Sequence, residues 1–337
     1  MIKILEKATR VCYNSVCKCE RGKNYMKSFA IISDTSCDLN KELRDRFGIA
    51  DYARGYVHLP DGTAVQGNLD WTEEESVAFF KALSDKKSHF KTATPSIGEV
   101  IDTLEPFLKN GEDVLCVTLS GGLSGMYGVF VNAKRDLDEK YPDRKIIIVD
   151  SMRYSTSEGM VCVLASQYRA MGKTIEETTE LLEVNKHRVH QIGWMDDLFY
   201  CKKMGRVSNA AAVMGTLVGI KAMADFNHKG VSHVLGKTRG YKNAYRLIVE
   251  YMKATGEDLE DQIIFITHSL RKEHAEEVKK LIEAEIKPKE IIITTVGQGS
   301  APHVGPGMVA AFYLGKKASE DLKDETVIFE ELASKIK

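Results

Sequence analysis

Four short loops in this sequence combine hydroxyl side chains, glycine and acidic residues, which are residue types that can hold a small polar group. They are Asp34-Thr35-Ser36, Thr92-Ala93-Thr94-Pro95-Ser96, Ser120-Gly121-Gly122-Leu123-Ser124-Gly125 and Asp150-Ser151. A hydroxyl can donate to a carboxylate or phosphate oxygen. Several of these loops lead into an expected helix, whose first turn offers free N–H groups and a partial positive charge. The pattern therefore predicts a site for something small and anionic.

The sequence does not contain the common catalytic motifs at their required spacing. Residues 122–126 read Gly-Leu-Ser-Gly-Met and lack the last glycine of the G-x-S-x-G nucleophile elbow. No G-x4-G-K-[ST] phosphate-binding loop occurs. Gly305-Pro306-Gly307 matches a dinucleotide-binding loop only loosely, because Pro306 removes an N–H that such a loop would use. We expect a binding protein that is not an enzyme.

Metal chemistry is also poorly supported by the nine histidines. There is no H-E-x-x-H pair, and neither His187 with His190 nor His228 with His233 has an acidic or cysteine partner at ligand spacing. We therefore expect no metal and no cofactor. Two alternatives stay open: an enzyme acting on a small anionic substrate at the same loops, with His303 as general acid or base, and a regulatory module that binds another amphiphile.

The composition is that of an ordinary globular protein. The chain has 337 residues, of which 43% are hydrophobic, and 47 Lys and Arg oppose 48 Asp and Glu. These figures exclude a disordered, collagen-like or coiled-coil chain, and a basic nucleic-acid binder. At about 150 residues per domain, the length predicts two domains.

Alternating strands and helices must position the loops. In the first half, buried β-branched runs such as residues 113–119 and 145–149 are separated by helical patterns, which indicates a parallel sheet covered on both faces. Ligands of such sheets bind at the loops after the strands. In the second half, a turn at Asn227-His228-Lys229-Gly230 joins two expected strands, which favours a mixed or antiparallel sheet.

The fold class is therefore α/β with two domains: a three-layer N-terminal domain with a parallel sheet, and a C-terminal domain with a mixed or antiparallel sheet. The expected divisions are a poorly ordered leader (1–27), the N-terminal domain (28–172), the C-terminal domain (173–315) and a charged C-terminal tail (316–337).

The chain gives no sign of a membrane span or a signal peptide. The longest uncharged stretch, residues 291–315, is interrupted by five glycines and two prolines, so it reads as a strand, a loop and a short buried element. The seven cysteines are odd in number and scattered, which favours a reducing cytoplasm. Cys12, Cys17 and Cys19 lack a nearby fourth ligand for a closed zinc site.

Six motifs in one order resemble the DegV family of fatty-acid-binding proteins, over residues 31 to about 315. They are Ser33-Asp34-Thr35-Ser36-Cys37-Asp38-Leu39, Lys91-Thr92-Ala93-Thr94-Pro95-Ser96-Ile97-Gly98-Glu99, Leu119-Ser120-Gly121-Gly122-Leu123-Ser124-Gly125-Met126-Tyr127, Val149-Asp150-Ser151, Asp196-Asp197-Leu198 with Lys203-Met204-Gly205-Arg206-Val207-Ser208, and His303-Val304-Gly305-Pro306-Gly307.

The resemblance implies that the chain holds one long-chain fatty acid, such as hexadecanoate (palmitate) or oleate, at the interface of its two domains. It further implies a partner, a separate fatty acid kinase that converts the presented carboxylate to an acyl phosphate for phospholipid synthesis. The missing phosphate-binding loop agrees with such a division of labour.

The resemblance also implies roles for single residues. Thr92, Ser124 and His303 occupy the positions of the family's carboxylate ligands, and two hydroxyls with an imidazole can all donate to one carboxylate. The family usually has Ser at the position of Ala93, which could alter the surroundings of the ligands. Ser120 and Gly122 are further candidates for that supporting layer. Arg239 lies where the family places an arginine that contacts the kinase, although a solvated charge is the plain alternative.

A lipid tail needs a dry tunnel, and each buried CH₂ contributes about 0.8 kcal/mol. The apolar stretch from residue 210 to 223 is a candidate lining, with ordinary core packing as the alternative. Its candidate residues are Met214, Leu217, Val218, Ile220 and Met223.

Overall fold

The structure is a computed structural model that describes residues 29–85, 87–208 and 219–336. The expected leader at 1–27 and three of the candidate tail-lining residues, Met214, Leu217 and Val218, lie outside the described residues.

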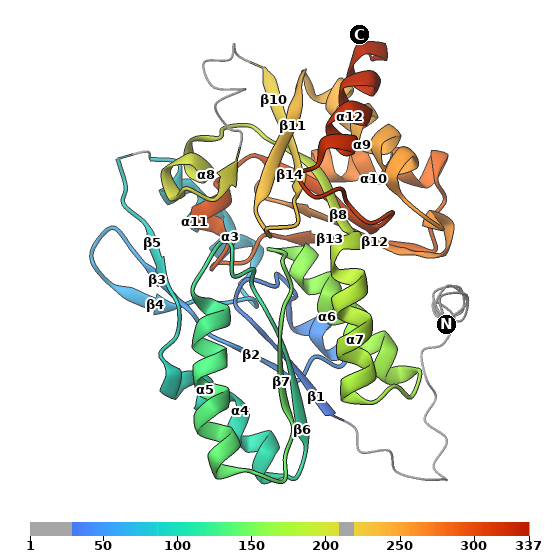
Figure 1. Ribbon diagram of the computed structural model, residues 1–337. Coiled ribbons are helices and arrows are strands. Elements are labelled where there is room, and N and C mark those ends of the chain that lie inside the picture. Colours follow the sequence, from blue (N-terminus) through green and yellow to red (C-terminus); the bar gives the residue numbers. More distant parts are fainter. Residues whose placement is uncertain (1–28, 86, 209–218, 337) are drawn as a thin grey trace.

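The first half of the chain forms a parallel sheet between two layers of helices, as the sequence predicts (Figure 1). Its strand order is β2-β1-β6-β7, and every neighbouring pair is parallel. The strands are β1 (Phe29–Asp34), β2 (Asp51–Ala53), β6 (Asp113–Thr118) and β7 (Ile146–Asp150). The helices that cover it are α2 (Lys41–Phe47), α4 (Ile97–Lys109), α5 (Met126–Lys140), α6 (Thr156–Ala170) and α7 (Ile175–Asn185).

The residues at the start of strand β1 are all apolar because both faces of the strand are covered. Ala30 and Ile32 pack in the core formed with α4 and α5, whereas Phe29 and Ile31 pack in the core that includes α6. Successive strand residues face opposite sides of a sheet, so a strand with helices on both faces has no polar side. The three-layer architecture is confirmed.

A small antiparallel sheet, which the sequence analysis did not anticipate, lies beside this domain. It has the order β4-β3-β5 and consists of β3 (Tyr56–His58), β4 (Ala64–Gln66) and β5 (Lys91–Ala93). Helix α3 (Glu73–Leu83) precedes β5 and begins with a capping box between Thr72 and Glu75. This sheet places Thr92 opposite Val57.

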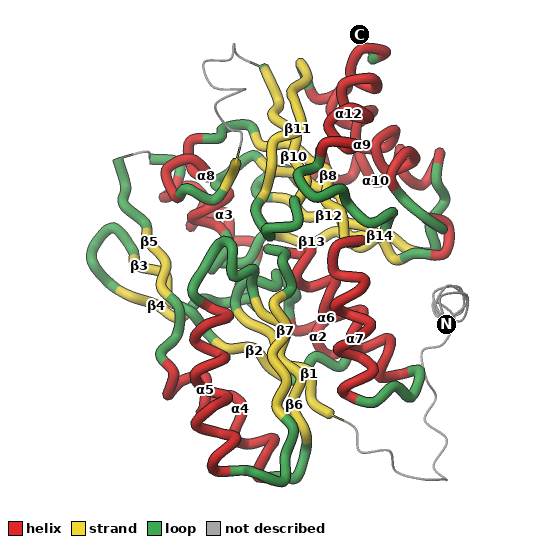
Figure 2. Tube along the Cα trace, viewed as in Figure 1, coloured by secondary structure: helices red, strands yellow, loops and turns green. Residues whose placement is uncertain are grey.

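The second sheet has seven strands in the order β13-β12-β14-β8-β10-β11-β9 and is mixed, which confirms the predicted class. The strands are β8 (Val189–Met195), β9 (Val207–Ser208), β10 (Ile220–Phe226), β11 (Ser232–Arg239), β12 (Ile263–His268), β13 (Glu290–Thr295) and β14 (Met308–Leu314). Helices α9 (Tyr241–Thr255), α10 (Lys272–Glu285) and α12 (Lys323–Lys335) pack on one face of it (Figure 2). The short helices α8 (Phe199–Met204) and α11 (Ala301–Val304) lie near its other face.

Helix α6 is the element that joins the two halves. It contacts β1 and β6 of the first sheet and β8 and β14 of the second. Its first ten residues, 156–165, are all buried, because a helix between two sheets has no solvent-facing side.

The packing of two segments, α7 and α12, bears on how the chain divides. Helix α7 contacts α6 and β7, so the second sheet begins only at β8, after the expected domain border at residue 173. The segment expected as a charged tail contains α12, whose Phe329 is buried against β11. A Cβ on Gly236 would lie 2.5 Å from the Phe329 ring, so the glycine makes room for this contact. Among the described residues, no helix has both the length and the apolar character that crossing a membrane requires.

Candidate functional site

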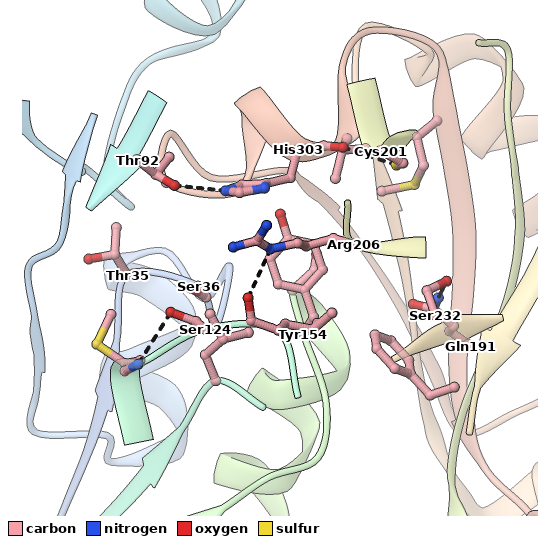
Figure 3. A pocket seen from close by; sticks show the side chains of 18 of the residues that line it. Thr35, Ser36, Thr92, Ser124, Tyr154, Gln191, Cys201, Arg206, Ser232 and His303 are labelled. Atoms are coloured by element: carbon pink, nitrogen blue, oxygen red, sulfur yellow. Dashed lines mark hydrogen bonds between the residues drawn. The ribbon is translucent and has the colours of Figure 1, made fainter. Parts of the chain in front are cut away.

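A cavity of about 310 Å³ lies where the loops of the first domain meet the open face of the second sheet (Figure 3). One wall consists of the loops that the sequence analysis singled out, through residues such as Thr35, Thr92 and Ser124. The opposite wall is mostly apolar and comes from the second sheet, through side chains that include Met195, Phe226, Met308, Ala310 and Phe312. The cavity is therefore polar at the loops and mostly apolar along the sheet.

Thr92 and His303 meet at the loop side of the cavity. Thr92 Oγ1 lies 2.9 Å from His303 Nε2, although the residues are 211 positions apart in sequence. Burial, followed by the charge of Arg206, lowers the pKa of His303 to about 4, so the imidazole is neutral near pH 7. If Nε2–H donates to Thr92, the Thr92 hydroxyl is left to donate to a ligand.

Ser124 lines the same cavity, from the loop that leads into α5. Its Oγ accepts a hydrogen bond at 3.2 Å from the N–H of Met126, the first residue of α5, although the N-cap position is Gly125. The same hydroxyl can still donate its own proton to a ligand. The structure thus brings Thr92, Ser124 and His303 to one cavity.

Arg206 also lines the cavity, and the sequence analysis gave it no role. Its Nε donates to the carbonyl of Leu123 at 2.9 Å, and its Nη1 donates to the carbonyl of Met204. Arg206 carries the one full positive charge among the described lining residues. In the sequence, Arg206 is marked only by its place within the Lys203 to Ser208 motif.

The loop that precedes α11 is held by residues of the first domain. Asp38 accepts hydrogen bonds from Gly297 N at 3.0 Å and Ser300 Oγ at 2.9 Å, and also from Ser155 Oγ. The hydroxyl of Tyr154 donates to the carbonyl of Ser300 at 2.8 Å. Because α11 carries His303, these contacts position the imidazole relative to the loops of the other domain.

Asp38 makes the stability of the protein depend on pH. Burial raises the pKa of Asp38 from 3.8 to about 7. Between these values the folded chain binds more protons than the unfolded chain, so the free energy of unfolding falls as pH rises. We expect Asp38→Asn, which mimics the protonated acid, to flatten this fall by up to about 1.4 kcal/mol per pH unit between pH 5 and 7.

Chemical denaturation at several pH values measures this slope. Asp61→Asn is the control, because the backbone N–H of Thr63 lowers the pKa of Asp61 and its titration lies below the window. An Asp38→Asn protein with the slope of the wild type would contradict the assignment.

The three candidate supporting residues differ in position. Ala93 lines the cavity directly. Ser120 is buried, and its Oγ accepts from Gly122 N at 3.1 Å. A Cβ on Gly122 would lie 2.2 Å from the carbonyl oxygen of Lys229, so this glycine allows the β10–β11 turn to approach the loop. Ser120 and Gly122 therefore shape the loop without facing the cavity.

Of the candidate tail-lining residues that the structure describes, neither Ile220 nor Met223 lines the cavity. Met223 is fully buried in the core on the opposite face of the second sheet. Ile220 is half-buried at the start of β10, opposite the exposed Arg239 of β11. Strand β10 contributes Ala224 and Phe226 to the cavity instead, because successive side chains of a strand alternate between its two faces and Met223 faces the opposite core.

Within the described ranges, no group of three or more His, Cys, Asp or Glu side chains could hold a metal ion. The described cysteines of the chain, Cys37, Cys116, Cys162 and Cys201, are buried free thiols.

The fold and the cavity define a two-domain α/β protein with a largely apolar site between the domains. The chain belongs to the DegV family, whose model, described as "Uncharacterised protein, DegV family", matches residues 28–316. It is 31% identical to a DegV domain-containing protein of Clostridium perfringens, over 86% of this chain and 98% of that protein.

Solved structures show the same fold. A fatty acid binding DegV family protein from Streptococcus agalactiae superposes with a TM-score of 0.70 at 26% identity, covering 86% of this chain and 99% of that one. A stearic acid-binding protein from Eubacterium ventriosum superposes with a TM-score of 0.75 at 24% identity, with the same coverage.

Proposed function

We propose that this protein binds one long-chain fatty acid in the cavity and presents its carboxylate to a separate fatty acid kinase. The observation that carries the proposal is the cavity, whose long apolar wall along the second sheet ends at Thr92, Ser124, His303 and Arg206. A carboxylate would accept charge-assisted hydrogen bonds at that end. The tail would supply most of the affinity, at about 0.8 kcal/mol for each buried CH₂.

The similar structures support this proposal. The proteins from Streptococcus agalactiae and Eubacterium ventriosum are described as binding fatty acid and stearic acid. A neutral His303 that donates its Nε2–H to Thr92 leaves the Thr92 hydroxyl to donate to a carboxylate, and with its pKa near 4 the imidazole is a weak base for catalysis at pH 7. The carrier role is therefore favoured over an enzyme for small anions.

Calorimetric titration of delipidated protein tests the binding role. Hexadecanoate is expected to bind at one molecule per chain, methyl hexadecanoate at least about tenfold more weakly because it lacks the carboxylate charge, and butyrate not measurably. Butyrate binding as tightly as hexadecanoate would instead favour an enzyme for a small anionic substrate.

Arg239 is the proposed contact with the kinase. It is exposed at the end of β11 and does not line the cavity, so its replacement should leave the lipid site intact. We expect Arg239→Glu to slow acyl-phosphate formation by a fatty acid kinase about tenfold, because reversing a charge at the rim of an interface slows association.

The matched control is Arg135→Glu, at an arginine whose side chain is 72% exposed on α5 of the other domain. Hexadecanoate binding should be unchanged in both variants. Equal phosphorylation rates for wild type and Arg239→Glu would remove this role from Arg239.

A further inference from the structure

The end of the cavity opposite Thr92 carries a second polar group. Gln191 and Ser232 line the cavity on the side opposite Thr92 and Thr35 (Figure 3). Strand β8 runs along this wall from Met195, which neighbours Cys201 of α8, to Gln191. Met195 and Gln191 are four residues apart, and at a rise of about 3.3 Å per strand residue they are separated by about 13 Å. A ligand whose carboxylate lies at Thr92 and His303 would therefore place its tail near Gln191.

The wall around Gln191 is otherwise apolar. Phe312 lies opposite Gln191 across the β8–β14 pair, and Phe226 lies opposite Ser232 across the β10–β11 pair. Both aromatic side chains line the cavity, as does Ala224. A hydrocarbon tail in contact with the amide would deprive it of water without replacing the lost hydrogen bonds, which is unfavourable.

The amide of Gln191 is also poorly paired. Its Nε2 donates to Ser232 Oγ at 3.4 Å, which is long for a hydrogen bond, and its Oε1 has no hydrogen-bond partner among the described residues. The backbone N–H of Gln191 donates to Asp225 Oδ1 at 2.9 Å and fixes the strand. The neighbouring His190 contacts Asp225 in the interior, so the alternation of the strand turns Gln191 the other way, to the cavity.

We propose that the cavity selects a long-chain fatty acid that carries a hydroxyl group in the distal part of its chain, where Gln191 binds it. This inference rests on the proposed function. A hydroxyl both donates and accepts, so it can donate to Gln191 Oε1 and accept from the second N–H of the amide. Sites that hydrogen-bond a ligand hydroxyl discriminate against analogues without it, because the polar group of the site is then left unpaired.

Competition between hexadecanoate and its single-hydroxyl isomers, measured by native mass spectrometry, tests the inference. In the wild type, at least one isomer hydroxylated between carbons 12 and 16 is expected to bind about tenfold more tightly than hexadecanoate. An isomer hydroxylated at carbon 8, where the wall is apolar, should bind more weakly than hexadecanoate.

Gln191→Leu should reverse the preference, so that hexadecanoate binds more tightly than every hydroxylated isomer. Gln167→Leu is the matched control, because Gln167 is a half-buried glutamine on α6 that does not line the cavity, and it should keep the wild-type order.

Three outcomes separate the claims. If the wild type binds hexadecanoate more tightly than all distal isomers, the inference is overturned while the carrier function stands; this comparison needs no variant. If the preference for a distal hydroxyl survives in Gln191→Leu, the assignment to Gln191 is overturned. If neither hexadecanoate nor any isomer binds, the proposed function itself fails, and the inference with it.

Discussion

Replacing Ala310 by phenylalanine is expected to lower the affinity for hexadecanoate about a hundredfold or more. Ala310 lies on β14, between Met308 and Phe312, and its side chain lines the cavity. A phenyl ring at this position would occupy space that the tail needs. If it displaces about four CH₂ groups, the loss is about 3 kcal/mol, since each contributes about 0.8 kcal/mol.

Calorimetric titration measures this loss, and thermal unfolding shows whether the variant stays folded. Ala82→Phe is the control, because Ala82 is exposed on α3 and does not line the cavity, so its affinity for hexadecanoate should match that of the wild type. A folded Ala310→Phe protein with undiminished affinity would mean that the tail does not lie along β14.

The double variant Thr92→Val/His303→Leu is expected to bind hexadecanoate about 10- to 100-fold more weakly. Both substitutions remove donors while nearly keeping the volume, and hydrogen bonds to a charged group contribute about 1.5–3 kcal/mol. Binding of hexadecanol, which has no carboxylate, should change much less. The loss of affinity should therefore be large only for the ligand that has a carboxylate.

His89→Leu serves as the control, because His89 is an exposed histidine outside the cavity lining. Since the pKa of His303 is about 4, the imidazole does not titrate between pH 6 and 8. Its protonation should therefore not change the affinity of the wild type for hexadecanoate in that range. Equal losses for hexadecanoate and hexadecanol would show that Thr92 and His303 shape the cavity without binding the carboxylate.

The loops of the site were predictable because their signals are local. Alternating strands and helices place the carboxyl ends of parallel strands at one edge, and the Ser96–Glu99 capping box marks the start of α4. The resemblance to the family added His303, which lies on α11 beside the second sheet. The meeting of Thr92 with His303 depends on the packing of the two domains, which no local pattern encodes.

The lining of the tail could not be predicted for a different reason. The sequence of a strand such as β10 shows that it is largely apolar, but it does not show which of its two faces meets the cavity. Helix α6 was missed because its first ten residues are all buried, so they carry no distinct apolar stripe. The sequence does not show that Gln191 is a polar residue in an apolar wall, because its neighbours Phe226 and Phe312 come from other strands.

Identification of the ligand that co-purifies with the intact protein tests the central claim most directly. Native mass spectrometry, followed by lipid extraction under denaturing conditions, should show about one long-chain fatty acid per chain. Delipidated protein should take up added hexadecanoate or oleate in the same ratio. A protein that is isolated empty and also fails to bind either acid would contradict the account.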